Sequence, residues 1–263
     1  MNSKPLVAFI GCGNVGETLA LAFLRAGVPV GAVIIPEHSP VDRVHPALRR
    51  YVTSKLIVPA GCDFAIVAVP DNRLQGVADT LLVPEKCVVV HTSGGSDADI
   101  LKACSGRFGV LYPLQTFTRG EDINMAEIPL FTEASDYYTL EKIDRLASLI
   151  SDRAYHADSR KRRRLHLSAV FVCNFVNHMV HAGYDLAMKE GIGRELFGPL
   201  LDETFRKIVF KGPERSQTGP AVRGDNKTVV RHMEELKDNP ILHELYRVVT
   251  ESIIYYQKDL KDD

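Results

Sequence analysis

The sequence lacks the cysteine pattern of a disulfide-stabilised or zinc-binding protein. Only five cysteines occur among 263 residues, and they form no Cys-x-x-Cys pair. Their odd number and wide spacing make a disulfide framework or a metal site unexpected. Most are flanked by small or apolar residues, so we expect them to act as small core hydrophobes in a reducing, cytoplasmic compartment.

An excess of either charge is also absent. Lys and Arg number 32 against 33 Asp and Glu, which gives a formal net charge of −1. This balance argues against bulk binding of nucleic acid. A composition that is 45% hydrophobic and 25% charged is typical of a globular protein. It excludes disorder, a collagen-like chain and a disulfide-rich mini-protein.

Long apolar runs are scarce as well. The first, residues 6–10, is followed at once by glycines and is too short for a secretory signal. Residues 165–184 contain no Asp, Glu, Lys or Arg, and this length could cross a bilayer. Three histidines and two asparagines in the segment would be costly in hydrocarbon. We therefore expect a helix inside the protein and no membrane partner.

Residues 1–155 alternate short apolar strands with helical stretches. Near-continuous Val, Ile and Ala runs are typical of strands buried on both faces of a parallel sheet. The sequence therefore predicts an α/β, doubly wound Rossmann domain with a mostly parallel sheet. Strands are expected at residues 6–10, 30–35, 56–58, 64–69, 87–91 and 110–112, with a helix over 14–26.

Residues 156–263 have a different pattern. Strand signals stop and a 3.6-residue periodicity predicts an all-helical domain for substrate binding and dimerisation. Helices are expected over residues 159–190, 195–210, 226–237 and 240–260, with a Gly/Pro loop over 212–224.

The strongest local motif is a Gly-x-Gly-x-x-Gly turn between the first strand and its helix. Gly11 permits the tight turn, Gly13 lets the backbone approach a diphosphate, and Gly16 lets the helix pack close to the strand. The helix begins at Asn14, and the N–H groups of its first residues, Asn14 and Val15, are unpaired and can bind an anion. The alternative is an ordinary glycine-rich turn that binds nothing.

The residues after the second strand leave the choice of cofactor open. Glu37 lies 21 residues beyond Gly16, where an acidic residue would bind the ribose 2′-hydroxyl of NAD. His38 and Arg43 could instead meet the 2′-phosphate of NADP. Glu37 could also be a solvated loop residue.

Two further strand ends are expected at the ligand-binding edge of the sheet. Val69 and Pro70 follow the fourth strand and should line the cofactor cleft, while Asp71 caps the next helix. Ser93 follows the fifth strand and could face the nicotinamide or the substrate. The alternative for its loop is helix capping by Ser96 or Asp97.

The helix expected over residues 159–190 carries the candidate chemistry. His166 and Asn174 would share one helix face, about 12 Å apart along the axis at 1.5 Å per residue. A histidine can donate the proton that a reduced carbonyl or imine needs, and an asparagine amide can hold its oxygen. The alternative is that both are satisfied polar residues at a buried interface.

Two basic features have competing interpretations. Arg223 lies in a loop that Gly219 and Gly224 make adaptable, where it could clamp a substrate anion or pair with Asp225, the expected cap of the next helix. The run at residues 160–164 is interpreted mainly as a solvated helix face, although one of its cations could reach an anionic ligand. No spacing of histidines and acids favours a metal site.

These motifs resemble a family of Rossmann-like NADP oxidoreductases with a 6-phosphogluconate-dehydrogenase-like helical C-terminal domain. The resemblance covers nearly the whole chain and is more distant to pyrroline-carboxylate reductases and β-hydroxyacid dehydrogenases. It implies a cofactor cleft, NADP as cofactor and often a dimer built through the helical domain. Where the family usually has His, this chain has Tyr112. The matching stretches are GCGNVG, AIVAVPDN, VVHTSGG, YPLQTF, LHLSAVFVCNF, TGPAVRGD and TVVRHMEEL.

Together, the residues and the resemblance predict a homodimeric NAD(P)-dependent oxidoreductase. It would transfer hydride to or from a small carbonyl, hydroxy or imine substrate, with NADP as cofactor and NAD possible. The alternative is a non-catalytic NAD(P)-binding redox sensor or dimeric scaffold.

Overall fold

The computed structural model describes residues 4–262 and contains one eight-stranded sheet. The strand order is β3-β2-β1-β4-β5-β6-β7-β8, and every neighbouring pair is parallel except β6 and β7. The predicted α/β fold with a mostly parallel sheet is thereby confirmed. The strands are β1 (Val7–Ile10), β2 (Val30–Ile34), β3 (Val52–Thr53), β4 (Phe64–Val67), β5 (Val88–His91), β6 (Phe108–Pro113), β7 (Leu130–Ala134) and β8 (Ala154–His156).

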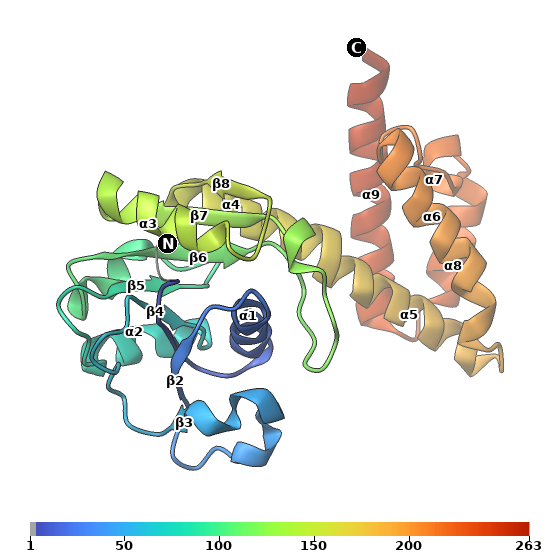
Figure 1. Ribbon diagram of the computed structural model, residues 1–263. Helices are drawn as coiled ribbons and strands as arrows, with labels where there is room; N and C mark the ends of the chain where they lie inside the picture. Colours follow the sequence, from blue (N-terminus) through green and yellow to red (C-terminus); the bar gives the residue numbers. More distant parts are fainter. Residues whose placement is uncertain (1–3, 263) are drawn as a thin grey trace. The chain divides into compact units, whose positions relative to one another are not determined.

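Helices cover both faces of this sheet. Because successive side chains of a strand point to opposite faces, Val7 and Phe9 of β1 enter one core and Ala8 and Ile10 enter the other. Figure 1 shows α1 and α2 on opposite sides of the sheet. The helices of this part are α1 (Asn14–Arg25), α2 (Asp71–Thr80), α3 (Tyr137–Ala147) and α4 (Ser159–Ala169).

The order of the strands creates a switch point between β1 and β4. From β1 the chain proceeds outward to β2 and β3, then returns to β4 on the other side. At such a point the connections that follow the two central strands lead to opposite sides, which leaves a crevice for a ligand at the carboxyl ends of the strands. In this chain the crevice lies next to the glycine turn after β1 and the segment after Val67 of β4.

Three expectations about strands are wrong. The third strand is Val52–Thr53, whereas Ile57 makes only an isolated bridge to Leu82. The strands β7 and β8 were not expected. Their side chains are polar or exposed in part, so their hydropathy resembles that of a loop.

The helix expected over residues 159–190 is interrupted. After α4 the chain forms a π-helix over Val170–Phe175 and resumes as α5 (Val176–Lys189). A π-turn contains more residues than an α-turn, so the 3.6-residue spacing that placed His166 and Asn174 on one face does not hold. The remaining helices are α6 (Gly198–Lys211), α7 (Pro220–Arg223), α8 (Asn226–Glu235) and α9 (Pro240–Asp262), with α7 inside the expected loop.

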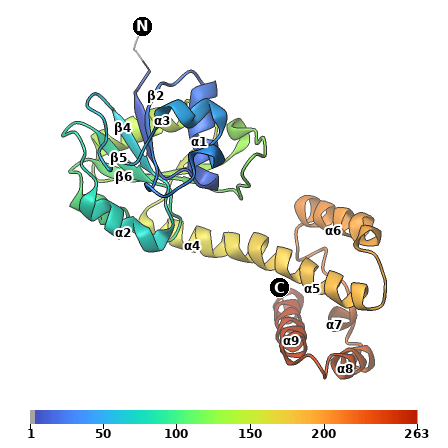
Figure 2. The ribbon, with the colours of Figure 1, turned by 90° about the horizontal axis from the view of Figure 1, so that it is seen from below.

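The chain divides into two compact units, Met1–Val172 and Cys173–Asp263. The first contains the sheet and both cores. The second consists of helices α5 to α9, which Figure 2 shows grouped together. The domain boundary that the sequence predicts at residue 155 remains a prediction. Within residues 4–262, no helix combines the length and the apolar character that a membrane span requires.

Candidate functional site

The glycine turn after β1 has the geometry that its spacing predicts. Gly11 adopts φ 94°, a conformation that side chains with a Cβ rarely take. A Cβ at Gly11 would overlap the carbonyl oxygen of Ala68, and one at Gly16 would overlap the carbonyl oxygen of Gly11. These two glycines therefore allow the turn, β4 and α1 to approach closely. A Cβ at Gly13 would meet no protein atom within 4 Å, so the space above it is open.

A cavity of about 500 Å³ opens at this turn. Three arginines line it, and no carboxylate from the described residues does. Such a lining is suited to a polyanionic ligand, since Arg offers several donors in a fixed fork. The lining includes Gly11, Cys12, Gly13, Ser39, Arg43, Val69, Pro70, Arg73 and Arg119.

The predicted cofactor residues are only partly gathered around this cavity. Gly11, Gly13, Val69 and Pro70 line it. The other five predicted residues are not among its lining: Asn14, Val15, Gly16, Glu37 and Ser93.

Each of those five has another place in the fold. Asn14 donates its side-chain amide to the carbonyl of Phe117 at 2.8 Å, Val15 packs against the core, and Gly16 is buried against Gly11 and Ala68. Glu37 is exposed in the turn after β2.

Ser93 organises the loop that follows β5. Its hydroxyl oxygen accepts hydrogen bonds from the backbone N–H groups of Gly95 at 3.1 Å and Ser96 at 2.9 Å. Its own N–H donates to Nδ1 of His91 at 3.1 Å, while Nε2 of His91 lies 3.2 Å from the carbonyl oxygen of Asp97. Asp97 occupies the predicted cap position before a 3-10 helix, but its side chain makes no capping hydrogen bond.

His91 is a fixed, neutral part of this loop. It is fully buried, and burial, with a smaller contribution from the Arg162 charge, lowers its pKa to about 3. A neutral imidazole that accepts at Nδ1 carries its proton on Nε2 and donates it to Asp97. His91 therefore shapes the loop rather than exchanging protons near neutral pH.

His166 of α4 lies against the same loop. Its Nδ1 is 3.2 Å from the hydroxyl oxygen of Tyr112 at the end of β6, and the two rings meet edge to face. A Cβ at Gly94 would come within 2.7 Å of the His166 ring. Gly94 thus allows the imidazole to pack directly on the backbone, a role that the sequence alone did not reveal.

The Tyr112 phenol of this pair stays protonated near neutral pH. Burial raises its pKa, the nearby Asp71 carboxylate raises it further, and the Arg162 charge lowers it in part. A phenol that stays protonated and donates to Nδ1 leaves the proton of a neutral His166 ring on Nε2. The other ring nitrogen is therefore the one free to act on a ligand.

Asp71 is not the predicted helix cap. Pro70 occupies the cap position of α2, and Asp71 sits in the first turn. Among the residues that the structure describes, none forms a hydrogen bond or an ion pair with its carboxylate. A Cβ at Gly95 would lie 3.2 Å from Oδ2 of Asp71, so this carboxylate borders the loop after β5.

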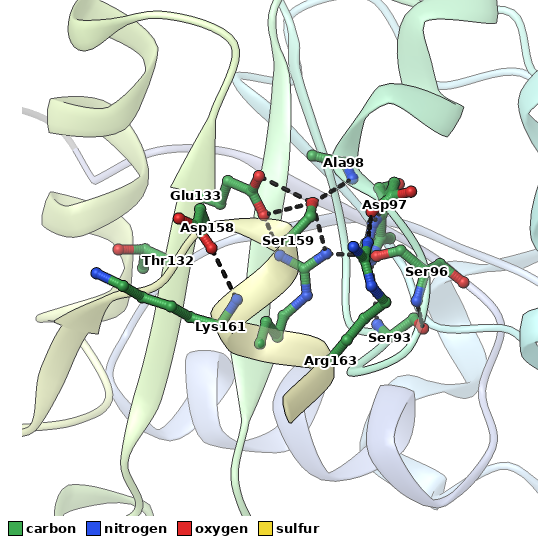
Figure 3. A network of polar contacts seen from close by, with 12 residues as sticks. Ser93, Ser96, Asp97, Ala98, Thr132, Glu133, Asp158, Ser159, Lys161 and Arg163 are labelled. Carbon is green, nitrogen blue, oxygen red and sulfur yellow. Dashed lines mark hydrogen bonds and ion pairs between the residues drawn. The ribbon is translucent and has the colours of Figure 1, made fainter. Parts of the chain in front are cut away.

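A buried arginine fastens α4 to the sheet. Arg162 is fully buried and pairs with Glu133 of β7, and its Nη2 also donates to the carbonyl of Ser96. Ser159 donates to Glu133 at 2.9 Å and accepts from the N–H of Ala98 at 3.2 Å (Figure 3). The interpretation of residues 160–164 as a solvated face is therefore wrong for Arg162.

The remaining predicted site residues belong to the helical unit. Asn174 lies in the π-helical segment and is exposed. Arg223 ends the short α7 and is also exposed, followed by Gly224 at φ 69°. Asp225 caps α8 as predicted, since its carboxylate accepts from the N–H of Thr228 at 3.1 Å. The hydrogen bond from the Thr228 hydroxyl at 2.8 Å, together with this N–H bond, lowers the pKa of Asp225.

Cys12 is in the glycine turn but is not a reactive thiolate. Its burial and the adjacent Glu17 raise its pKa to about 12. Its thiol lies 3.8 Å from Oε2 of Glu17 and remains protonated near neutral pH.

Comparison with known proteins places the chain in a family. A model for a Rossmann-like domain matches residues 2–115, and one for a domain of unknown function, DUF2520, matches residues 128–253. No match was found among curated proteins.

Solved structures resemble the whole chain. A Bacteroides fragilis protein described as a "putative NADP oxidoreductase" is 32% identical with a TM-score of 0.85, covering 96% of this chain and 98% of that one. A Thermotoga maritima protein is 22% identical, with a TM-score of 0.71 and coverage of 98% and 100%.

More distant structures share the fold. An imine reductase from Myxococcus stipitatus in complex with NADP+ is 13% identical, with a TM-score of 0.59 and coverage of 98% and 94%. The near full-length match at 32% identity determines the family. The chain belongs with the Bacteroides fragilis protein in a family of Rossmann-like proteins with a helical C-terminal region.

Proposed function

We propose that this protein is an NADP-dependent oxidoreductase that transfers hydride to or from a small carbonyl, hydroxy or imine substrate. The observation that carries the proposal is the cavity at the glycine turn, which three arginines line and no described carboxylate does. The description of the Bacteroides fragilis relative supports the same cofactor.

The lining of the cavity favours NADP over NAD. The diphosphate would lie over the open backbone at Gly13. Ser39 and Arg43, from the segment after β2, and Arg73 of α2 also line the cavity and would hold the additional 2′-phosphate. Glu37, which would have favoured NAD, does not line the cavity.

The pair formed by Tyr112 and His166 provides the proton chemistry of the proposal. The bound cofactor would supply or accept the hydride. Tyr112 holds Nδ1 of His166, so that Nε2 can donate a proton to the reduced substrate atom or accept one in the reverse direction. The Arg162–Glu133 pair keeps α4, and with it His166, against the loop after β5.

We also propose that two residues of the helical unit bind substrate. The Asn174 amide would bind a substrate oxygen or nitrogen, and the Arg223 guanidinium would clamp an anionic substrate group. We expect Asn174→Ala and Arg223→Lys to weaken turnover or substrate affinity without changing NADPH affinity. Unchanged kinetics in either variant would remove that residue from the site.

Isothermal titration with NADPH and NADH tests the cofactor. NADPH should bind more tightly than NADH, and Arg43→Ala should weaken NADPH binding while leaving NADH binding nearly unchanged. Binding of neither coenzyme at millimolar concentration would contradict the proposal. Equal loss for both coenzymes would remove Arg43 from the 2′-phosphate site.

Oxidation of NADPH over a panel of carbonyl and imine compounds tests catalysis. We expect His166→Ala to lower turnover by roughly 100-fold or more with NADPH affinity intact, as loss of a general acid does. Tyr112→Phe should reduce turnover less, since it removes only the bond that positions the ring. Tight NADPH binding without turnover of any compound would favour a redox sensor instead.

We also propose that the protein is a cytoplasmic homodimer. All five cysteines are free, which suits a reducing compartment. Among the described residues after Val172, Ala182 is the only buried one, while Val209, Phe210 and Ile241 are at least 75% exposed. Apolar helices with so little interior of their own are typical of subunits that bury them against a second copy.

A further inference from the structure

A loop far along the chain lies against the glycine turn. The connection between β6 and β7 contains Phe117, whose ring enters the core and whose carbonyl accepts the Asn14 amide at 2.8 Å. Asp122, near the other end of this loop, forms an exposed ion pair of 2.5 Å with Arg25 of α1. The loop is therefore attached to α1 at both of its ends.

Arg119 lies between these two attachments and reaches the turn itself. Its Nη2 donates to the carbonyl of Cys12, and its Nε lies 3.2 Å from Oε1 of Glu17. The Arg119 side chain is 37% exposed and lines the same cavity as Gly11 and Gly13. Three of its five N–H groups have no partner among the described residues, so they can meet a ligand.

Glu17 is the buried partner of the Arg119 guanidinium. Its side chain is only 5% exposed, and its Oε2 accepts the N–H of His45 at 2.9 Å. A buried carboxylate in the first turn of α1 would repel an anion at the glycine turn unless a cation lay between them. Arg119 occupies that position, with its charge toward the cavity and the carboxylate behind it.

We propose that Arg119 binds the diphosphate of the dinucleotide and that Glu17 is the positioning residue that orients its guanidinium. This inference rests on the proposed function and adds a phosphate ligand from outside the glycine motif. The opposing interpretation is that Arg119 only ties the loop to the turn.

Two fragments of the cofactor separate diphosphate binding from 2′-phosphate binding. ADP-ribose has the diphosphate but no 2′-phosphate, and adenosine 2′-monophosphate has the reverse. Their dissociation constants are measured by competition with NADPH fluorescence. Arg119→Ala should weaken ADP-ribose and NADPH binding by roughly 10- to 100-fold, the effect of losing a hydrogen bond between charged groups. The same variant should change the dissociation constant of adenosine 2′-monophosphate by less than about twofold.

Arg25→Ala is the matched control, because it removes an anchor of the same loop without touching the cavity lining. It should leave all three affinities unchanged. Arg119→Lys should recover part of the loss, since it restores the charge but not the fork. Glu17→Gln alone should weaken ADP-ribose binding, because it releases the guanidinium of Arg119. In the Arg119→Ala background it should not weaken binding further, because no guanidinium is left to orient and the lost carboxylate charge only relieves repulsion, which marks Glu17 as acting through Arg119.

The outcomes distinguish this inference from the proposed function. If the wild type binds NADPH but Arg119→Ala has no more effect on ADP-ribose than Arg25→Ala, only the role of Arg119 is overturned. The same holds if Arg119→Ala weakens adenosine 2′-monophosphate equally, because the loss would then reflect a distorted cavity. If the wild type binds none of the three nucleotides, the proposed function fails and the inference fails with it.

Discussion

At the scale of single residues, the sequence predicts those parts of the site that lie close together in the chain, but not those that only the fold brings together. The glycine turn could be predicted, because Gly11 and Gly16 act on neighbours that a strand-turn-helix always brings near. The pairing of Tyr112 with His166 could not, since 54 residues separate them and only the sheet brings them together. The sequence singles out Tyr112 only because the family usually has His at this position.

Gly94→Ala tests how closely His166 must approach the loop. The added Cβ would lie 2.7 Å from the ring, so the imidazole must shift and lose its bond to Tyr112. Displacements of this size can cost up to about 100-fold in rate, so we expect turnover to fall at least 10-fold with NADPH affinity unchanged. Gly76→Ala is the control, because a Cβ there meets nothing within 4 Å. Equal turnover in the two variants would show that the position of His166 is irrelevant.

His91 makes stability depend on pH. Its pKa is about 3 in the folded chain and near 6.5 when unfolded, so the unfolded state binds the extra proton between these values. Stability contributed by this group is thus full above pH 6.5 and is lost as pH falls toward 3. We expect it to cost about 2 kcal/mol between pH 7 and pH 5.

Urea unfolding at both pH values measures this loss. His91→Gln, which cannot be protonated, should show a smaller decrease in unfolding free energy than the wild type over the same interval. A decrease of the same size in both proteins would mean that His91 does not carry the effect.

At the scale of helices and strands, hydropathy predicts those strands whose two faces are both buried. The central strands β1, β4 and β5 were found because every residue in them is buried. The strands β7 and β8 were missed, because β7 carries Thr132 and Glu133 and all three residues of β8 are exposed. The π-helical interruption after α4 could not be predicted from the spacing of apolar residues.

The attachment of α4 depends on one buried ion pair, which Glu133→Ala tests. It would leave the Arg162 charge buried without its partner, and breaking such pairs typically costs about 3–5 kcal/mol. Asp97→Ala is the control, because its pair with Arg163 is largely exposed and should contribute at most about 1 kcal/mol. Chemical denaturation of both variants gives the comparison. A small effect for Glu133→Ala would mean that other contacts hold α4.

At the scale of the whole molecule, the two units differ in how well each covers its own apolar side chains. The sheet unit has two continuous cores, whereas the described helical unit buries little. The sequence predicted a helical second half from its periodicity. It could not show how much of the apolar surface those helices leave open, because that depends on how they pack.

Light scattering after size exclusion tests the proposed dimer. The wild type should be dimeric at micromolar concentration, and Phe210→Glu should shift it toward monomer, since this side chain is 78% exposed on α6. Tyr137→Glu, equally exposed at 77% but on the sheet unit, should not. A monomeric wild type, or the same shift in both variants, would contradict a dimer built through the helices.

The central claim is that the open backbone at Gly13 receives the diphosphate of NADPH. Isothermal titration of NADPH into the wild type and Gly13→Val measures this most directly. Because a Cβ at Gly13 meets no protein atom within 4 Å, the variant should fold normally and differ only in the space it fills. The account predicts saturable binding by the wild type and loss of at least 10-fold in affinity in the variant. Equal affinity in the two proteins would contradict it.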